Sequence, residues 1–302
     1  MTKNMEKLFK MIKERKAKRI FIQVPEGLKM RALEILEYFE KNGIKCFLSI
    51  EPCFGACDLR DEEAKKLGCD LLIHMGHEDF GLKTVLPVIY ETYEIDFNPI
   101  KLLKKNFDKL NFKKITLVSS IQFLPNLRKA KKFLESRGKI VYIAGKILGC
   151  DQSPALKFEK KTDCYLFIGS GIFHPLAIAV KTEKPVFVLD IELSRFIDME
   201  EYKKRYEKIK FAQIEKAKEF KNFGIFLSTK KGQFNLRIAE EVKAKIESKG
   251  KNAYIIVGDQ ITPEKIAGLK IDCIINTACP RISEDFKNFG KIILNPDDVD
   301  KI

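Results

Sequence analysis

Short apolar runs alternate with longer amphipathic stretches along this chain, and the same alternation occurs three times. In each copy an apolar run precedes a stretch with helical spacing, and two further apolar runs follow. The segments lie at 18–27, 30–43, 44–50 and 68–77, then at 113–122, 125–138, 139–145 and 162–171, and last at 222–232, 234–250, 251–259 and 271–279. Such a pattern indicates βαβ units, so each copy is predicted to be a small parallel sheet flanked by helices.

Landmark residues at matching places support the threefold internal repeat. A glycine ends each amphipathic stretch, where we expect it to cap the C-terminus of a helix: Gly43, Gly138 and Gly250. An aspartate opens the third strand expected in each copy: Asp70, Asp163 and Asp272. A fourth apolar run closes each copy, at 85–90, 184–190 and 290–296.

Additional residues separate the second copy from the third. They lie within 201–221 and carry apolar side chains at near-helical spacing: Tyr202, Tyr206, Ile209, Ala217 and Phe220. This segment is predicted to be a linker helix. The expected architecture is therefore an α/β protein of three similar small domains, at residues 1–100, at residues 101–200, and at residues 201–302 with the linker helix included.

Composition places the chain among globular proteins. Of its 302 residues 45% are hydrophobic and 32% are charged, which is enough apolar material for a core and enough charge for a solvated surface. No uninterrupted apolar run approaches the ~20 residues that cross a bilayer, and residues 1–20 have no apolar core that a signal peptidase would use. We therefore expect a cytoplasmic protein that has no membrane partner.

The net charge of +14 comes from 56 basic and 42 acidic residues. Lysines are interleaved with glutamates along the whole chain, as in 240–251, which is typical of solvated helix faces. No RNA-binding aromatic signature or helix-turn-helix spacing accompanies the charge, so nucleic acid is not expected as a partner. An acidic protein partner is consistent with it.

Three of the eight cysteines follow predicted strands, where ligands bind in open parallel sheets. Cys57 and Cys150 follow the second strands of copies one and two, and Cys279 ends the third strand of copy three. If the three domains pack with their carboxyl edges together around a central cluster, the three thiolates can hold a 4Fe-4S cluster with one open iron position. No CxxC pair is present, which makes a structural zinc site a weaker interpretation.

A cysteine that binds no cluster is commonly a small buried side chain of the apolar core. This interpretation applies best to the four cysteines within or beside apolar strands: Cys46, Cys69, Cys164 and Cys273. Cys53 shares a CFGAC segment with Cys57, and we interpret it as a neighbour of the cluster and not as a ligand.

Other motifs are weak. Residues 169–174 contain only two glycines of a dinucleotide fingerprint, and there is no Ser-His-Asp set or Walker motif. His74 and His77 are three residues apart on a predicted strand and should face opposite sides, so a two-histidine metal site is not expected. His77 is instead a candidate for contact with substrate.

Residues 55–77 (GACDLRDEEAKKLGCDLLIHMGH), 147–151 (ILGCD) and 276–286 (NTACPRISEDF) resemble the diphthamide synthase family, the archaeal 2-(3-amino-3-carboxypropyl)histidine synthases. The resemblance covers nearly the whole chain. It implies three similar domains, a homodimer, and a 4Fe-4S cluster held by Cys57, Cys150 and Cys279. Members of the family are non-standard radical S-adenosylmethionine (SAM) enzymes, because they lack the CxxxCxxC loop of ordinary radical SAM enzymes. This sequence also lacks that loop.

The resemblance also implies a reaction. The open iron binds SAM, and an electron from the reduced cluster breaks the bond between sulfur and the γ-carbon. The 3-amino-3-carboxypropyl radical then adds to imidazole C2 of a histidine in elongation factor 2, and 5′-methylthioadenosine is left. An electron donor is therefore a further expected partner. The strand ends offer His77, Gln122, Ser170 and Gln233 as candidate SAM-binding groups.

Two other functions are compatible with the residues. A quinolinate synthase-like condensing and dehydrating enzyme also resembles three α/β domains around a cluster held by three cysteines. A basic, non-enzymatic binding protein with buried structural cysteines would need no cofactor. A cluster enzyme purified without oxygen is brown, whereas a binding protein is colourless.

Overall fold

The computed structural model describes residues 2–285 and 289–302, and the resemblance segment 276–286 extends one residue beyond the first of these ranges. The chain divides into two compact units, which are described separately. The first contains residues 1–93 together with 230–233, and the second contains residues 94–229 and 234–302.

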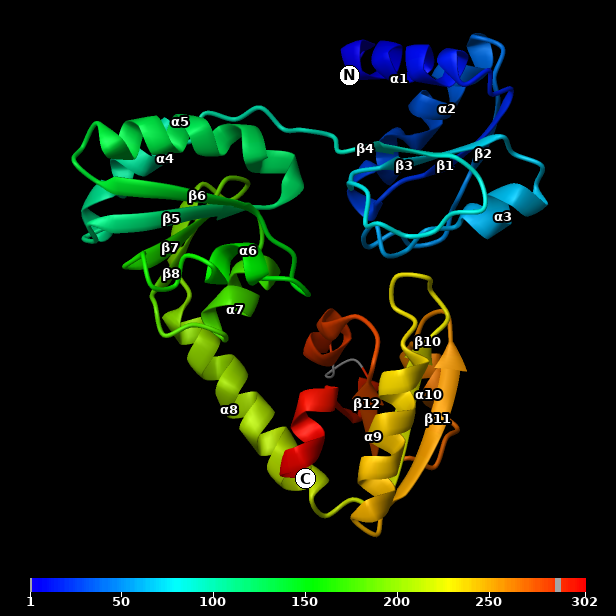
Figure 1. Cartoon of the computed structure of the whole chain (residues 1–302), viewed down its shortest axis with the longest axis vertical. Helices are drawn as coiled ribbons and strands as arrows, with labels where there is room; N and C mark the ends of the chain where they lie inside the picture. Colours follow the sequence, from blue (N-terminus) through cyan, green and yellow to red (C-terminus); the bar gives the residue numbers. More distant parts are fainter. Residues whose placement is uncertain (1, 286–288) are drawn as a thin grey trace. The chain divides into compact units, whose positions relative to one another are not determined.

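The first unit holds one parallel sheet and the helices that flank it (Figure 1). Its elements, in chain order, are α1 (Thr2–Glu14), β1 (Arg19–Gln23), α2 (Ala32–Lys41), β2 (Lys45–Leu48), α3 (Asp61–Lys66), β3 (Leu71–Met75) and β4 (Val88–Glu91). The strand order is β2-β1-β3-β4, and every pairing is parallel.

The second unit holds the other two sheets. Its first part consists of α4 (Ile100–Lys105), β5 (Lys114–Ser119), α5 (Leu124–Glu135), β6 (Ile140–Lys146), α6 (Ser153–Leu156), β7 (Cys164–Gly169), α7 (Phe173–Ala179), β8 (Val186–Asp190) and β9 (Arg195–Asp198). Its second part follows α8 (Glu200–Ala217) and consists of β10 (Asn222–Ser228), α9 (Leu236–Ser248), β11 (Asn252–Gly258), α10 (Pro263–Ile266), β12 (Cys273–Asn276) and β13 (Ile292–Leu294).

The three sheets have the same topology, which confirms the predicted α/β fold with three similar parallel sheets. The orders β6-β5-β7-β8 and β11-β10-β12-β13 repeat the order of the first sheet, and the second sheet adds β9 antiparallel to β8. In each sheet the first strand of the copy pairs with both the second and the third. This central strand is apolar on both faces because helices cover both.

The first sheet illustrates how the apolar strands are buried. Leu8 of α1 and Phe39 of α2 pack with Ile20 on one face, and Ala64 of α3 packs with Phe21 on the other. Two separate apolar cores therefore lie on opposite faces of one sheet, as expected for a doubly covered parallel sheet.

The landmark residues of the repeat have the roles that the sequence predicts. The three capping glycines have positive φ angles, at +78° for Gly43 and Gly138 and +74° for Gly250. Each aspartate side chain accepts hydrogen bonds from backbone N–H groups at the start of the first strand of its sheet. Asp70 accepts from Lys18 and Arg19, Asp163 accepts from Lys114, and Asp272 accepts from Lys221 and Asn222. In each sheet the carboxylate therefore links the N-terminal end of the first strand to the N-terminal end of the third strand.

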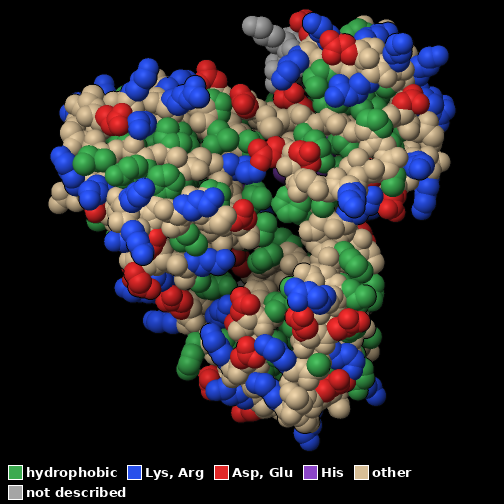
Figure 2. Space-filling model, viewed as in Figure 1, with side chains coloured by type: hydrophobic (Ala, Val, Ile, Leu, Met, Phe, Trp, Pro, Cys, Tyr) green, Lys and Arg blue, Asp and Glu red, His purple; other side chains and the backbone are tan. Residues whose placement is uncertain are grey.

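The predicted linker helix is α8, which ends at Ala217, four residues before the end of the sequence-based estimate. Ile214 and Ala217 are buried against the third sheet, while Tyr202 and Tyr206 pack against the second. Among the described residues, no helix has the length and apolar character needed to cross a membrane. Figure 2 shows Lys and Arg side chains scattered among Asp and Glu on the face in view, as the interleaved sequence predicts.

We predict that Asp272→Asn, which keeps an acceptor oxygen but removes the charge, lowers the free energy of unfolding by about 1 kcal/mol at pH 7. The backbone N–H groups of Asn222 and Lys221 hold the pKa of Asp272 below its usual value. This stabilisation is complete above the unfolded pKa of about 4 and is lost as the pH falls through the lowered native value. Denaturant unfolding at pH 7 and pH 3 measures it.

The exposed Asp108→Asn variant is the control and should leave stability unchanged at both pH values. A deficit in Asp272→Asn that is as large at pH 3 as at pH 7 would contradict the role of the charge.

Candidate functional site

Cys57 lies in the loop after β2 and is contacted by a loop that is distant in sequence. Residues 230–233, which follow β10, belong to the same compact unit as Cys57. The Gly232 N–H donates to the Cys57 carbonyl oxygen at 3.1 Å, and Gln233 Nε2 donates to Cys57 Sγ at 3.4 Å. Gln233, predicted as a SAM-binding group, therefore contacts the sulfur of a predicted cluster ligand.

Two lysines hold the 230–233 loop in place through ion pairs. Lys230 Nζ lies 2.5 Å from Asp58 Oδ2, with side chains only 4% and 2% exposed, and Lys231 Nζ lies 2.9 Å from Asp61. Burial raises the pKa of the Cys57 thiol, whereas the Gln233 hydrogen bond and the Lys230 charge favour the thiolate. Neither lysine stands out as a candidate in the sequence, since both look like ordinary surface residues in a Lys-rich chain.

Gly232 makes the close approach to Cys57 possible. A Cβ atom at this position would lie 2.5 Å from Cys57 Cα and 2.7 Å from its carbonyl oxygen. Because backbone atoms cannot move aside as a flexible side chain does, only glycine fits there.

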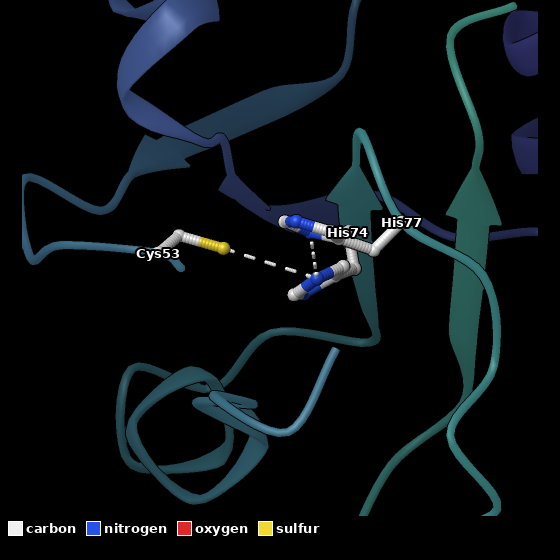
Figure 3. Close-up of side chains that lie close together, drawn as sticks. All are labelled: Cys53, His74 and His77. Carbon is white, nitrogen blue, oxygen red and sulfur yellow. Dashed lines mark hydrogen bonds between the residues drawn. The ribbon is translucent and has the colours of Figure 1, made fainter. Parts of the chain in front are cut away.

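His74 and His77 lie together, so the prediction that they face opposite sides is wrong. The strand β3 ends at Met75, and Gly76 has φ +82°, which turns the chain back before His77. Figure 3 shows the side chains of Cys53, His74 and His77 pointing toward one another. His77 Nδ1 lies 3.0 Å from His74 Nε2, and Cys53 Sγ lies 3.8 Å from the same nitrogen. The alternation of a strand applies only while the strand continues.

Burial controls the protonation of these three side chains. It lowers the pKa of His74 to about 3 and that of His77 to about 4, with the neighbouring His77 adding to the effect on His74. Burial also raises the pKa of Cys53 to about 12, and the Asp58 charge contributes. At pH 7 the cluster therefore contains two neutral imidazoles and a neutral thiol.

Gln23, at the buried end of β1, fixes the orientation of His74. Its Nε2 donates to the Asp58 carbonyl oxygen at 2.5 Å, and its Oε1 accepts from the Arg60 N–H at 3.3 Å and lies 3.2 Å from His74 Nδ1. An oxygen facing Nδ1 requires the proton on Nδ1 and leaves the lone pair on Nε2. A single polar residue in an apolar run was the only sequence signal for Gln23.

Cys150 and Cys279 both belong to the second unit. Cys150 is exposed in the loop after β6, and it lines a cavity of about 420 Å³ together with Thr277, Ala278 and Pro280, which surround Cys279. Cys279 itself is half-buried between β12 and the 3-10 helix Pro280–Asp285. Cys57 belongs to the other unit.

Buried amides shape both of these loops. Asn276 Nδ2 donates to the Cys279 carbonyl oxygen at 2.9 Å, and its Oδ1 accepts from the Ala278 N–H at 3.1 Å. Gln152 Nε2 donates to the carbonyl oxygens of Leu148 and Gly149, at 3.0 and 2.5 Å. Neither amide was a candidate in the sequence analysis, because the sequence does not show which polar residues turn inward.

The other two candidate SAM-binding groups follow neighbouring strands of the second sheet. Gln122 lies in the 3-10 turn Ile121–Phe123 after β5, where its carbonyl oxygen accepts from the Ile95 N–H. Ser170 directly follows β7. Both are half-buried at the carboxyl edge, whereas His77 and Gln233 lie in the first unit.

Four cysteines are buried in or beside the sheets, as predicted: Cys46, Cys69, Cys164 and Cys273. Burial raises the pKa of Cys46 and Cys164 to about 12. These thiols are unreactive core side chains at neutral pH.

The fold and the site together define a three-domain α/β protein in which a thiol follows a strand of every sheet. The model of a family described as "Putative diphthamide synthesis protein" matches residues 24–301. The chain therefore belongs to the diphthamide synthesis protein family, and it is an enzyme of the transferase class.

Several known proteins are similar over most of their own length. The 2-(3-amino-3-carboxypropyl)histidine synthase of Pyrococcus horikoshii is 36% identical to this chain, and the match covers 97% of this chain and 88% of the relative. The enzyme of Methanocaldococcus jannaschii is 34% identical, and the match covers 93% of this chain and 83% of the relative. Subunit 1 of the Caenorhabditis elegans enzyme is 31% identical, and the match covers 94% of this chain and 71% of that subunit. The crystal structure of Dph2 from P. horikoshii with a 4Fe-4S cluster has a TM-score of 0.91 at 35% identity, covering 98% of this chain and 89% of that one.

These matches decide among the three functions considered. They support diphthamide synthesis, and they favour neither the quinolinate synthase-like enzyme nor the non-enzymatic binding protein.

We predict that Gly232→Ala destabilises the protein by about 2 kcal/mol, because the added methyl group overlaps the Cys57 backbone. The 230–233 loop must then shift, which strains the buried Lys230–Asp58 pair. Gly268→Ala is the matched control, since a Cβ atom there meets no atom within 4 Å. Equal stability of the two variants in thermal unfolding would show that the contact is not required.

Proposed function

We propose that this protein catalyses the first step of diphthamide biosynthesis. It transfers the 3-amino-3-carboxypropyl group of SAM to imidazole C2 of a histidine in elongation factor 2, with 5′-methylthioadenosine as the other product. The observation that carries the proposal is the agreement between the family match and three cysteines, Cys57, Cys150 and Cys279, that follow strands of three different sheets.

The chemistry of these cysteines fits a 4Fe-4S cluster. None is in a disulfide, and all three are less buried than the core cysteines. Cys57 Sγ accepts an N–H bond from Gln233 beside the buried Lys230, and such contacts stabilise anionic sulfur. Cys57, Cys150 and Cys279 would therefore hold the cluster, which when bound supplies the electron that breaks the bond between sulfur and the γ-carbon of SAM.

The chain's own residues would bind and orient the substrates. Gln122, Ser170, His77 and Gln233 offer hydrogen bonds at strand ends for the polar groups of SAM. The neutral imidazole of His77 adds no positive charge that would repel a sulfonium ion. The exposed position of Cys150 at the 420 Å³ cavity leaves this thiol open to solvent, as binding of a large substrate requires.

The partners follow from the same proposal. Elongation factor 2 is the protein substrate, an electron donor reduces the cluster, and the protein acts in the cytoplasm as a homodimer. Support for an assembly comes from the eukaryotic relatives, which are named subunit 1.

We expect Cys150→Ala to lose most of its iron, because one of three thiolates that hold the cluster is removed. The matched control is Cys164→Ala, which removes a fully buried thiol and should cost about 1 to 2 kcal/mol of stability without loss of iron. Iron per chain after anaerobic reconstitution is the measurement. Full iron content in Cys150→Ala would refute the assignment of this ligand.

The product formed from SAM tests the reaction itself. Reduced, cluster-loaded protein should release 5′-methylthioadenosine, because the bond to the γ-carbon breaks, and Cys150→Ala should release none. Chromatography of the nucleosides distinguishes this product from 5′-deoxyadenosine. Formation of 5′-deoxyadenosine, or of no nucleoside at all, would exclude the proposed transfer.

A further inference from the structure

Cys53, His74 and His77 form the one group of at least three Cys, His, Asp or Glu ligand atoms within the described residues that lies close enough together to bind a single ion. We propose that these three side chains bind a divalent transition-metal ion, zinc above all. The proposal does not rest on the proposed function, because none of the three is a predicted ligand of the 4Fe-4S cluster. His77 is also a candidate SAM-binding group, and a zinc ion bound to its ring would take it out of that role.

The distances are close to those of a tetrahedral zinc site. Zinc bonds of about 2.0 Å to nitrogen and 2.3 Å to sulfur place two nitrogens about 3.3 Å apart, and a nitrogen and a sulfur about 3.6 Å apart. The corresponding distances are 3.0 Å from His74 Nε2 to His77 Nδ1 and 3.8 Å from His74 Nε2 to Cys53 Sγ. All three ligand atoms lie within 4.8 Å of one another. The two His74 distances need shifts of only a few tenths of an ångström, and the distance from Cys53 Sγ to the His77 nitrogen, which is within 4.8 Å, needs to close by at most about 1.2 Å.

The surroundings of His74 prepare it as a ligand. Gln23 Oε1 faces Nδ1, so the lone pair of His74 is on Nε2, which points at the other two groups. A hydrogen-bond acceptor behind a ligating imidazole is the usual outer contact of zinc-bound histidine. Gln23 is itself held by Asp58 and Arg60, so the acceptor is fixed before any ion arrives.

Binding requires two proton movements, and both can occur here. In the metal-free protein the His77 Nδ1–H donates to His74 Nε2, so on metal binding this proton moves to His77 Nε2 through solvent. Cys53 releases its thiol proton to water, since only the thiolate binds metal. His77 is half-buried, which gives its ring and a fourth ligand, such as water, access to solvent.

Coordination would join directly two segments that Gln23 already connects through hydrogen bonds to Asp58, Arg60 and His74. Cys53 lies in the loop after β2 that also carries Cys57, while His74 and His77 lie at the end of β3. A metal bond between them would hold the Cys57 loop against the sheet. One thiolate and two imidazoles favour zinc or cobalt over magnesium or calcium, which prefer oxygen ligands.

The test uses the full chain with its cluster loaded under anaerobic conditions, so that the cluster cysteines are occupied. The protein is incubated with Zn²⁺ and dialysed, and zinc and iron per chain are measured by mass spectrometry. We expect one zinc per chain and unchanged iron. X-ray absorption at the zinc edge should show one sulfur at about 2.3 Å and two nitrogens at about 2.0 Å.

Variants test the individual ligands. Cys53→Ser and His77→Gln should each bind Zn²⁺ at least about 100-fold more weakly in competition with a chromophoric chelator. The matched control is Cys46→Ser, because the Cys46 thiol is also buried in the first unit but donates to the Ile44 carbonyl oxygen. It should bind zinc as the unaltered protein does.

Three results would overturn the proposal. They are the absence of retained zinc in the unaltered protein, undiminished zinc binding in both variants, and a zinc shell made only of sulfur, which would indicate binding at other cysteines. If one variant fails to fold, the second variant and the absorption spectrum of the unaltered protein still decide.

Discussion

Parallel pairing of the first strand with both of its neighbours is the constraint on which the rest of the structure depends. Strands that run in the same direction end at the same edge of a sheet, so the loops that follow them emerge side by side. In all three sheets that edge carries the polar and thiol side chains, while the strands themselves are apolar and buried. Each copy of the repeat reproduces the same strand order.

A buried ion pair keeps the Cys57 loop in place. Removing Lys230 and Asp58 from water is costly, and their attraction compensates only when the geometry is close, as it is at 2.5 Å. Without Lys230 the buried Asp58 carboxylate would lose its partner at 2.5 Å and keep the Arg60 guanidinium at 4.0 Å. The third copy thus contributes a loop, residues 230–233, that packs onto the cysteine of the first, and Gly232 and Gln233 provide the contact.

Two metal environments would then lie near one another along the chain. Burial raises the pKa of the Cys57 thiol and the contacts with Gln233 and Lys230 oppose that rise, whereas Cys53 lies among neutral imidazoles in a buried position. The two cysteines are four residues apart but have different partners, because the loop between them turns at Gly55 and directs their side chains to different neighbours. A zinc ion on Cys53 would hold that loop without using a thiolate that the 4Fe-4S cluster needs.

The sequence by itself determined the threefold α/β repeat, the capping glycines, the aspartates that open the third strands and the burial of four cysteines. These features depend on local periodicity and turn chemistry, which can be seen in a short window of residues. Only the tertiary structure decided that Gln233 contacts Cys57, that Lys230 pairs with Asp58, and that His74, His77 and Cys53 meet. Those contacts join residues that are far apart in the chain or depend on where β3 ends and how Gly76 turns, and neither periodicity nor composition encodes the direction of a side chain beyond the end of a strand.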